Sequence, residues 1–214
     1  MAKKYCLISG HTSSGRLKEI DTRVLNEGGN KKVLVLNMAS DDLEKIKTRS
    51  NFFARYFEEL GADEVKIATA ETSLDKIGSE FRKVGLVYIP GGDTNVLARH
   101  LKERVLEKMI KSYSGFIGGI IAGNSAGAYA IGQVYPKIRE GQVEVFPMIG
   151  LVNFSVKAHY TPEFDPILKE LSYDRLIFAL QDESAIFCST PLPEGAEFIG
   201  TVWKFAKGDK EQVH

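Results

Sequence analysis

The feature that most constrains the fold is a regular alternation of short apolar runs with longer amphipathic segments. The runs are continuously apolar and rich in Val, Ile and Leu, a pattern typical of parallel strands that are buried on both faces of a sheet. We expect such strands at residues 5–9, 32–37, 65–68, 86–90 and 116–122.

The segments between these runs have the spacing of amphipathic helices. In residues 43–60 the apolar side chains fall roughly on one face, and Gly61 follows as a natural helix stop. Residues 73–83 and 95–110 have the same pattern. Strands that alternate with helices predict a doubly wound α/β fold, with a mostly parallel sheet and helices on both faces.

The later part of the chain is richer in β-structure, and no linker separates it from the first part. Gly and Pro are spread through it, and there is no internal repeat or low-complexity segment. We therefore expect one domain over residues 1–214. Further strands are expected at residues 142–146, 176–180, 184–189 and 197–205.

Composition excludes several classes of protein. The 214 residues carry 28 basic and 28 acidic side chains, and this balance argues against a protein whose main partner is nucleic acid. Cys6 and Cys188 are the two cysteines, too few for a disulfide framework, and no C-x-x-C pair is present for zinc. We expect neither a cofactor nor a metal.

Residues 112–136 carry no charge. This uncharged stretch is long enough to raise the question of a membrane span. The glycines in this stretch, together with Asn124 and Gln133, favour a buried strand, a turn and a buried helix instead. The apolar run near Met1 is too short for a signal peptide. We expect no membrane contact and a cytoplasmic location.

The most informative motif is G-x-S-x-G, formed by Gly123, Ser125 and Gly127 between an apolar run and a small-residue helix. In such a nucleophile elbow the serine lies in a strained strand-to-helix turn, so its neighbours must be small. The N–H of Ala126 can then face a developing oxyanion. A tight turn without chemistry is the alternative interpretation.

A second glycine turn, Gly91-Gly92-Asp93, follows the expected strand at residues 86–90. Two such strand ends on one parallel sheet form a crevice in which ligands bind. The Gly92 amide is a candidate second oxyanion donor, and we place Gly91 and Asp93 in the same candidate site. Alternatively, Asp93 or Thr94 caps the helix that follows.

A serine hydroxyl needs a general base, and histidine is the usual one. His159, at the end of a strand-like run, is the best candidate of the four histidines. His11 follows the first expected strand and could contact a ligand, His100 lies within a helical pattern, and His214 is the last residue.

The third member of such a site is a carboxylate that orients the imidazole. Asp182 and Glu183 directly precede an apolar run. Spacing does not choose between these two, and it leaves Glu163 and Asp165 open as well.

In their order and spacing, four segments together resemble the dipeptidase E and cyanophycinase family of serine peptidases, over most of the chain up to about residue 190. The resemblance implies a class I glutamine amidotransferase-like fold and hydrolysis of peptide bonds next to aspartyl residues. It also implies Ser125 as nucleophile, His159 as base and Glu183 as the acid that orients it, with the Gly92 and Ala126 amides as the oxyanion hole. The segments are Gly91–Thr94, Gly123–Ala128, His159–Tyr160 and Asp182–Ala185.

Two departures narrow what the resemblance implies. The amidotransferases use cysteine, and a glutamate two residues after the histidine, where this chain has Ser125 and Thr161; glutamine hydrolysis is therefore not expected. Family members that cleave aspartyl bonds tend to have arginines soon after the histidine, whereas residues 160–166 are acidic here. The cations that remain for a substrate carboxylate are Lys157, Lys169 and Arg175.

The sequence therefore predicts a metal-independent serine peptidase that hydrolyses a small peptide through Ser125, His159, Glu183 and an acyl-enzyme, with an aspartyl dipeptide as one candidate substrate. The expected assembly is a monomer or homodimer. One alternative is a catalytically silent protein that binds a small ligand on the same scaffold. Another is an esterase or acyltransferase that uses the same triad.

Overall fold

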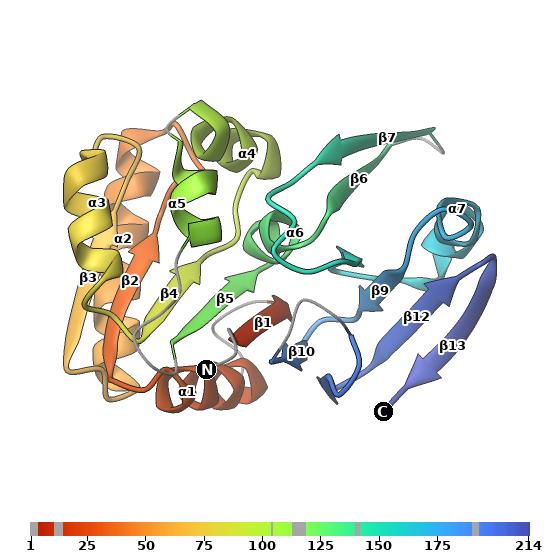
Figure 1. Ribbon diagram of the computed structural model, residues 1–214, viewed down its shortest axis with the longest axis horizontal. Coiled ribbons are helices and arrows are strands. Elements are labelled where there is room, and N and C mark those ends of the chain that lie inside the picture. The colour runs from red at the N-terminus through yellow and green to blue at the C-terminus, as the bar shows by residue number, and fades with distance from the viewer. Residues whose placement is uncertain (1–3, 11–14, 104, 113–118, 140–141, 190–192) are drawn as a thin grey trace.

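The computed structural model describes residues 4–10, 15–103, 105–112, 119–139, 142–189 and 193–214. Its main element is a seven-stranded sheet with the strand order β11-β10-β1-β5-β4-β2-β3 (Figure 1). The five strands from β1 to β3 in this order run parallel, while β10 and β11 are antiparallel to their neighbours. The strands are β1 (Lys4–Ser9), β2 (Lys32–Leu36), β3 (Glu64–Ala68), β4 (Leu86–Ile89), β5 (Ile120–Asn124), β10 (Ser184–Cys188) and β11 (Glu197–Ile199).

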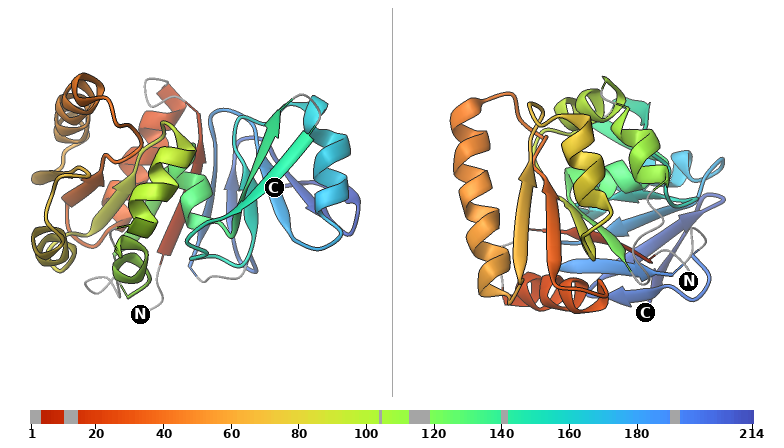
Figure 2. Two further views of the ribbon diagram at one scale, coloured as in Figure 1. Left: turned by 90° about the horizontal axis from the view of Figure 1, so that it is seen from above. Right: turned by 60° about the vertical axis from the view of Figure 1, so that its left-hand side comes forward.

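Helices cover both faces of this sheet (Figure 2). Side chains alternate across a strand, so Val33 and Val35 of β2 pack in one hydrophobic cluster and Leu34 and Leu36 in the other. The first cluster includes α1 (Gly15–Glu27) and α2 (Leu43–Glu59). The second includes α3 (Leu74–Phe81), α4 (Thr94–Glu103), α5 (Leu106–Ser112) and α6 (Ala126–Ile131).

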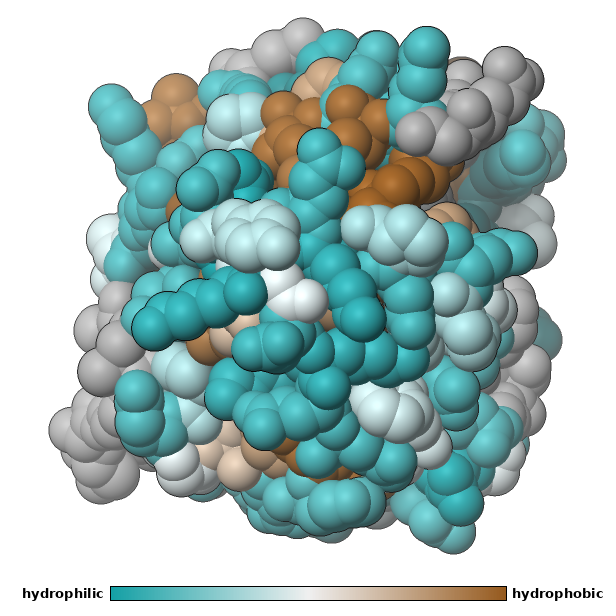
Figure 3. All heavy atoms as spheres, turned by 90° about the vertical axis from the view of Figure 1, so that its right-hand side faces the viewer, coloured by the Kyte–Doolittle hydropathy of each residue, from teal (hydrophilic) through white to brown (hydrophobic). Residues whose placement is uncertain are grey.

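A second sheet of four strands, in the order β13-β12-β9-β8, lies at the other end of the molecule (Figure 1). Phe154, Phe178 and Val202 from this part share one hydrophobic cluster with Ile89 of the main sheet, so the core continues between the two sheets. Seen from that end, the surface is largely hydrophilic, with hydrophobic side chains gathered near the top of the view (Figure 3). The elements are β8 (Ser155–Lys157), β9 (Ile177–Leu180), β12 (Val202–Ala206), β13 (Asp209–Val213), α7 (Asp165–Leu171) and the hairpin of β6 (Val134–Arg139) and β7 (Gln142–Pro147).

The expected α/β architecture with a mostly parallel sheet is confirmed, and two expected elements are divided. The helix expected over 95–110 is α4 and α5, and between them Val105 has a φ of 60°. The strand expected over 197–205 is β11 and β12, which belong to different sheets and are separated by Gly200 at φ 76°. The strand expected over 116–122 is β5, although residues 113–118 lie outside the described part.

Several elements were not anticipated, because their sequences are more polar than a buried element. Helix α1 and the short α7 were missed, and so were strand β6 and the largely exposed strand β13. Across the described residues, no helix combines the length and the apolar character needed to cross a membrane.

A buried carboxyl group links two helices to the main sheet. Asp21 of α1 is 1% exposed and accepts hydrogen bonds at Oδ2 from the hydroxyls of Tyr56 (2.7 Å) and Tyr88 (3.4 Å). Its Oδ1 atom is buried and has no hydrogen-bond partner among the described residues. Burial raises the pKa of Asp21 to about 7, and the two tyrosine hydrogen bonds act in the opposite direction.

We expect Asp21 to make stability depend on pH in a direction unusual for a carboxyl group. Because its pKa of about 7 in the folded protein exceeds the value near 3.9 of an unfolded chain, the folded protein holds the extra proton between these values. The stabilisation is therefore complete below about pH 4 and is lost as the pH rises through about 7. When the pH is raised from 5 to 8, the free energy of unfolding measured with urea should fall by roughly 2 kcal/mol more in wild type than in Asp21→Asn. An equal pH dependence in the two proteins would contradict this assignment.

Candidate active site

The carboxyl ends of three neighbouring parallel strands bring the candidate residues together. Gly10 follows β1, Gly91 follows β4 and Ser125 follows β5. The pairing of β5 with both of the other strands fixes this arrangement, since Asn124 is opposite Ile8 and Gly123 is opposite Ile89. This is the edge of the sheet at which ligands bind in open α/β folds.

Ser125 lies in a strained turn between β5 and α6. Its φ of 53° and ψ of −109° are unusual for a residue with a side chain, and its N–H donates to the Ile8 carbonyl at 2.9 Å. The glycines on either side allow very close packing: a Cβ on Gly123 would lie 2.3 Å from the Gly127 carbonyl oxygen, and one on Gly127 would lie 1.8 Å from that of Ile89. The geometry is that of a nucleophile elbow, and Ala126 begins α6 directly after it.

The structure brings His159 to Ser125, as expected. Ser125 Oγ lies 2.8 Å from His159 Nε2, within hydrogen-bond distance. His159 follows β8 and also has a positive φ, of 52°. Its N–H donates to Ser9 Oγ at 2.8 Å, and the Ser9 hydroxyl donates to the Leu180 carbonyl at 3.2 Å. Sequence reasoning missed Ser9, although its place at the carboxyl end of the first strand was a usable signal.

The carboxylate beside His159 belongs to Asp182, whereas the family resemblance implied Glu183. His159 Nδ1 lies 2.6 Å from Asp182 Oδ1. The two acidic residues form the turn before β10, and Glu183 has a φ of 62°. The Asp182 carboxylate therefore occupies the position that was expected for Glu183.

The other two carboxylates considered as partners of His159 form hydrogen bonds with other residues. Asp165 accepts hydrogen bonds from the Tyr160 hydroxyl and, at 2.7 Å, from Lys210 Nζ. Glu163 accepts one from the Thr161 hydroxyl at 2.9 Å.

A cavity of about 230 Å³ opens beside Ser125. Arg49 and Phe53 contribute side chains to it from α2, and neither was anticipated from the sequence. Asn124, which is 4% exposed, also lines it, and its Oδ1 has no partner within the described residues. The lining residues are Gly10, Arg49, Phe53, Gly91, Gly92, Asn124, Ser125 and His159.

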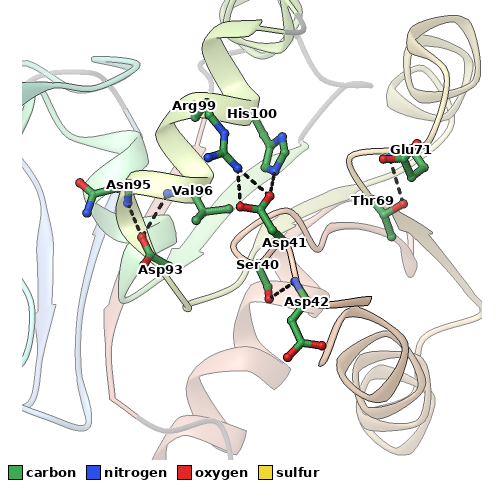
Figure 4. A network of polar contacts seen from close by, with 10 residues as sticks. All are labelled: Ser40, Asp41, Asp42, Thr69, Glu71, Asp93, Asn95, Val96, Arg99 and His100. Atoms are coloured by element: carbon green, nitrogen blue, oxygen red, sulfur yellow. Dashed lines mark hydrogen bonds and ion pairs between the residues drawn. The ribbon is translucent and has the colours of Figure 1, made fainter. Parts of the chain in front are cut away.

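Of the glycine turn, Gly91 and Gly92 line this cavity, whereas Asp93 caps α4. Asp93 Oδ1 accepts hydrogen bonds from the N–H groups of Asn95 (2.8 Å) and Val96 (3.1 Å) (Figure 4). Asp93 N–H donates to the Ala39 carbonyl at 2.9 Å, which joins the turn to the segment after β2. The capping role considered for Asp93 is thus present, and its expected contact with a substrate stays a prediction.

A second contact joins the same two segments. Asp41 lies between two side chains of α4, with Oδ1 2.6 Å from Arg99 Nη2 and 2.9 Å from His100 Nε2 (Figure 4). His100 therefore lies on a helix, as its sequence pattern indicated, and contacts a carboxylate outside the cavity beside Ser125. His11 lies outside the described residues, and His214 is exposed at the end of the chain.

The three cations considered for a substrate carboxylate lie outside the lining of this cavity. Lys157 is 8% exposed; its Nζ donates to the Ala158 carbonyl at 2.7 Å and lies 4.0 Å from the centre of the Phe164 ring. Burial lowers the pKa of Lys157 to about 8, although the nearby carboxylates of Glu163 and Asp182 raise it. Lys169 is exposed on α7, and Arg175 is partly exposed. Among the described residues, no three His, Cys, Asp or Glu side chains are grouped so as to hold a metal ion.

Comparison with known proteins gives one family match and one curated relative. The model of peptidase family S51 matches residues 6–190. An uncharacterized peptidase of Listeria innocua serovar 6a is 32% identical over 110 residues, which cover 48% of this chain and 52% of the relative. The chain thus aligns with about half the length of this relative.

The solved structures that share the fold include two described as peptidases. A peptidase from an acI-B1 Actinobacterium superposes with a TM-score of 0.77 at 20% identity, over 100% of this chain and 94% of that one. A putative peptidase E protein from Listeria monocytogenes EGD-e has a TM-score of 0.64 at 20% identity, over 100% of both chains. At this level of identity the likeness shows a common fold.

We expect Asp182, rather than Glu183, to control the reactivity of Ser125. Asp182→Asn removes the charge that holds His159 in the orientation and tautomer needed to accept a proton, so labelling of Ser125 by a fluorophosphonate should slow roughly a hundredfold or more. Glu183→Gln is the matched control and should change the labelling rate less than about threefold, well below the effect of an orienting carboxylate. A larger loss in Glu183→Gln than in Asp182→Asn would reverse the assignment.

Proposed function

The chain belongs to peptidase family S51, and from that premise we propose that it hydrolyses small peptides with Ser125 as the nucleophile. The observation that carries the proposal is the 2.8 Å contact between Ser125 Oγ and His159 Nε2 at a strained strand-to-helix turn. A serine and a histidine in this relation form the reactive pair of an acyl-transfer site. The family match agrees with the resemblance to dipeptidase E on which the sequence prediction was based.

In the proposed reaction, His159 Nε2 accepts the proton of Ser125 as its Oγ attacks the carbonyl carbon of the scissile bond. Asp182 holds the imidazole through Nδ1 and stabilises its positive charge. The N–H groups of Ala126 and Gly92 stabilise the oxyanion. Protonated His159 then gives its proton to the leaving amine, and water hydrolyses the acyl-enzyme by the reverse sequence of proton transfers.

The size of the cavity supports a short peptide as the substrate. The cavity volume of about 230 Å³ is below the ~300–1,000 Å³ typical of sites for drug-sized ligands. This smaller volume suits a substrate of one or two residues. The family resemblance keeps an aspartyl dipeptide among the candidate substrates.

The remaining parts of the proposal rest on sequence alone. The balanced charge of the chain supports a function without nucleic acid. The monomer or homodimer and the cytoplasmic location stay predictions.

We expect Ser125→Ala to abolish hydrolysis, because its Oγ forms the acyl-enzyme. Wild type should cleave members of a panel of aspartyl, β-aspartyl and neutral dipeptides, and Ser125→Ala should be slower by at least about 10³-fold. Ser112→Ala, which removes an exposed hydroxyl on α5, serves as the control and should leave the rate unchanged.

Three outcomes would contradict this function in different ways. Equal turnover by wild type and Ser125→Ala would remove Ser125 from the mechanism. Thermal stabilisation by a dipeptide without turnover across the panel would favour a silent binding protein. Turnover of simple esters far faster than any dipeptide would favour an esterase or acyltransferase.

A further inference from the structure

The guanidinium of Arg49 contacts the backbone of the glycine turn beside Ser125. Arg49 projects from α2, and its Nη2 donates a hydrogen bond to the Gly91 carbonyl oxygen. A Cβ on Gly92 would lie 3.0 Å from Arg49 Nη1, so the guanidinium is packed closely against this turn. The contact joins residues that are 42 positions apart in the chain.

This hydrogen bond acts on the same peptide group that carries the proposed oxyanion donor. The Gly91 C=O and the Gly92 N–H belong to one planar unit, and the described residues contain no cis peptide bond. In a trans peptide the C=O and the N–H point in opposite directions. Holding the Gly91 oxygen toward Arg49 therefore fixes the direction of the Gly92 N–H.

The backbone alone does not fix this direction. Rotation of the peptide group changes ψ of Gly91 and φ of Gly92, and both residues are glycines, which accept conformations that other residues avoid. Gly92 has a φ of 138°, in the region that favours glycine. Among the described residues, no acceptor is paired with the Gly92 N–H. A hydrogen bond to the Gly91 oxygen then selects one orientation of this peptide.

We propose that Arg49 is a positioning residue that holds the Gly91–Gly92 peptide in the orientation in which the Gly92 N–H faces the oxyanion. This inference rests on the proposed function. A cationic donor on the carbonyl also polarises the peptide, which makes its N–H a stronger hydrogen-bond donor. Arg49 acts through the peptide and does not itself touch the reacting atoms.

The surroundings of Arg49 fit a fixed structural contact. Its guanidinium carbon lies 5.7 Å from the centre of the Phe53 ring, one helical turn further along α2. Phe53 is 4% exposed and contacts Tyr88 of β4, the strand that ends at this glycine turn. Helix α2 and the turn are therefore joined by apolar packing as well as by the hydrogen bond.

A direct role in binding a substrate carboxylate is the competing explanation, because Arg49 lines the cavity. The two roles differ in what they affect. A positioning residue acts on every substrate whose reaction forms an oxyanion, and it acts on kcat. A carboxylate ligand acts only on substrates that carry a carboxylate, and it acts mainly on KM.

The test compares Arg49→Met and Arg49→Lys with Arg55→Met, which removes an exposed arginine from the same helix. Each protein is assayed with an aspartyl dipeptide, with the neutral ester p-nitrophenyl acetate, and by the rate at which a fluorophosphonate labels Ser125. Circular dichroism and thermal melting report whether each variant is folded.

We expect Arg49→Met to lower kcat roughly a hundredfold for the dipeptide and for the neutral ester, and to slow labelling by a similar factor, with KM within about threefold of wild type. Arg49→Lys should recover part of the loss, because its ammonium can still donate to the Gly91 oxygen. Arg55→Met should match wild type.

A loss confined to the KM of the aspartyl dipeptide would assign Arg49 to substrate binding and overturn the proposal. Unchanged ester hydrolysis and unchanged labelling in Arg49→Met would overturn it as well. If wild type cleaves no dipeptide, the proposed peptidase function fails separately, because the ester and labelling rates still decide the role of Arg49.

Discussion

The contact on which the site depends is the backbone approach of α6 to β4. Gly127 lies so close to Ile89 that an added Cβ would be 1.8 Å from its carbonyl oxygen. Only glycine allows a helix to pack against a strand at this distance. The contact places the start of α6 beside the end of β4, and so Ser125 lies against the Gly91–Gly92 turn: a Cβ on Gly91 would be 3.0 Å from that of Ser125.

Backbone strain is concentrated around the proposed active site. Ser125, His159 and Glu183 have positive φ values, as do two other described non-glycine residues, Val105 and Lys207. Such conformations persist when the surrounding structure over-determines them. Strand β1 supplies much of that constraint, since Ile8 accepts from Ser125 N–H and Ser9 accepts from His159 N–H. Strand β1 thus holds both Ser125, which follows a strand of the main sheet, and His159, which follows a strand of the second sheet.

The sequence predicted the parts of this structure that leave a local pattern. Continuous apolar runs marked the parallel strands, and the G-x-S-x-G spacing marked the elbow at Ser125. His159 was found by its place at a strand end. The choice between Asp182 and Glu183 depends on the direction in which each side chain leaves a turn, and spacing carries no information about that direction. Arg49 left no local signal, because its partner Gly91 is distant in the chain and an arginine on an amphipathic helix is usually a surface charge.

Residues of helix α2 connect the hydrophobic core to the proposed active site. Arg49, Phe53 and Tyr56 follow one another at spacings of four and three residues, so they lie along one helix face. Tyr56 bonds the buried Asp21, Phe53 packs on Tyr88, and Arg49 bonds the Gly91 carbonyl. The first two contacts fix the rotation and height of the helix against the sheet. Apolar packing and a buried carboxyl group, both at a distance from Ser125, therefore set the position of the Arg49 guanidinium at the glycine turn. A change in either contact would alter the orientation of the Gly91–Gly92 peptide.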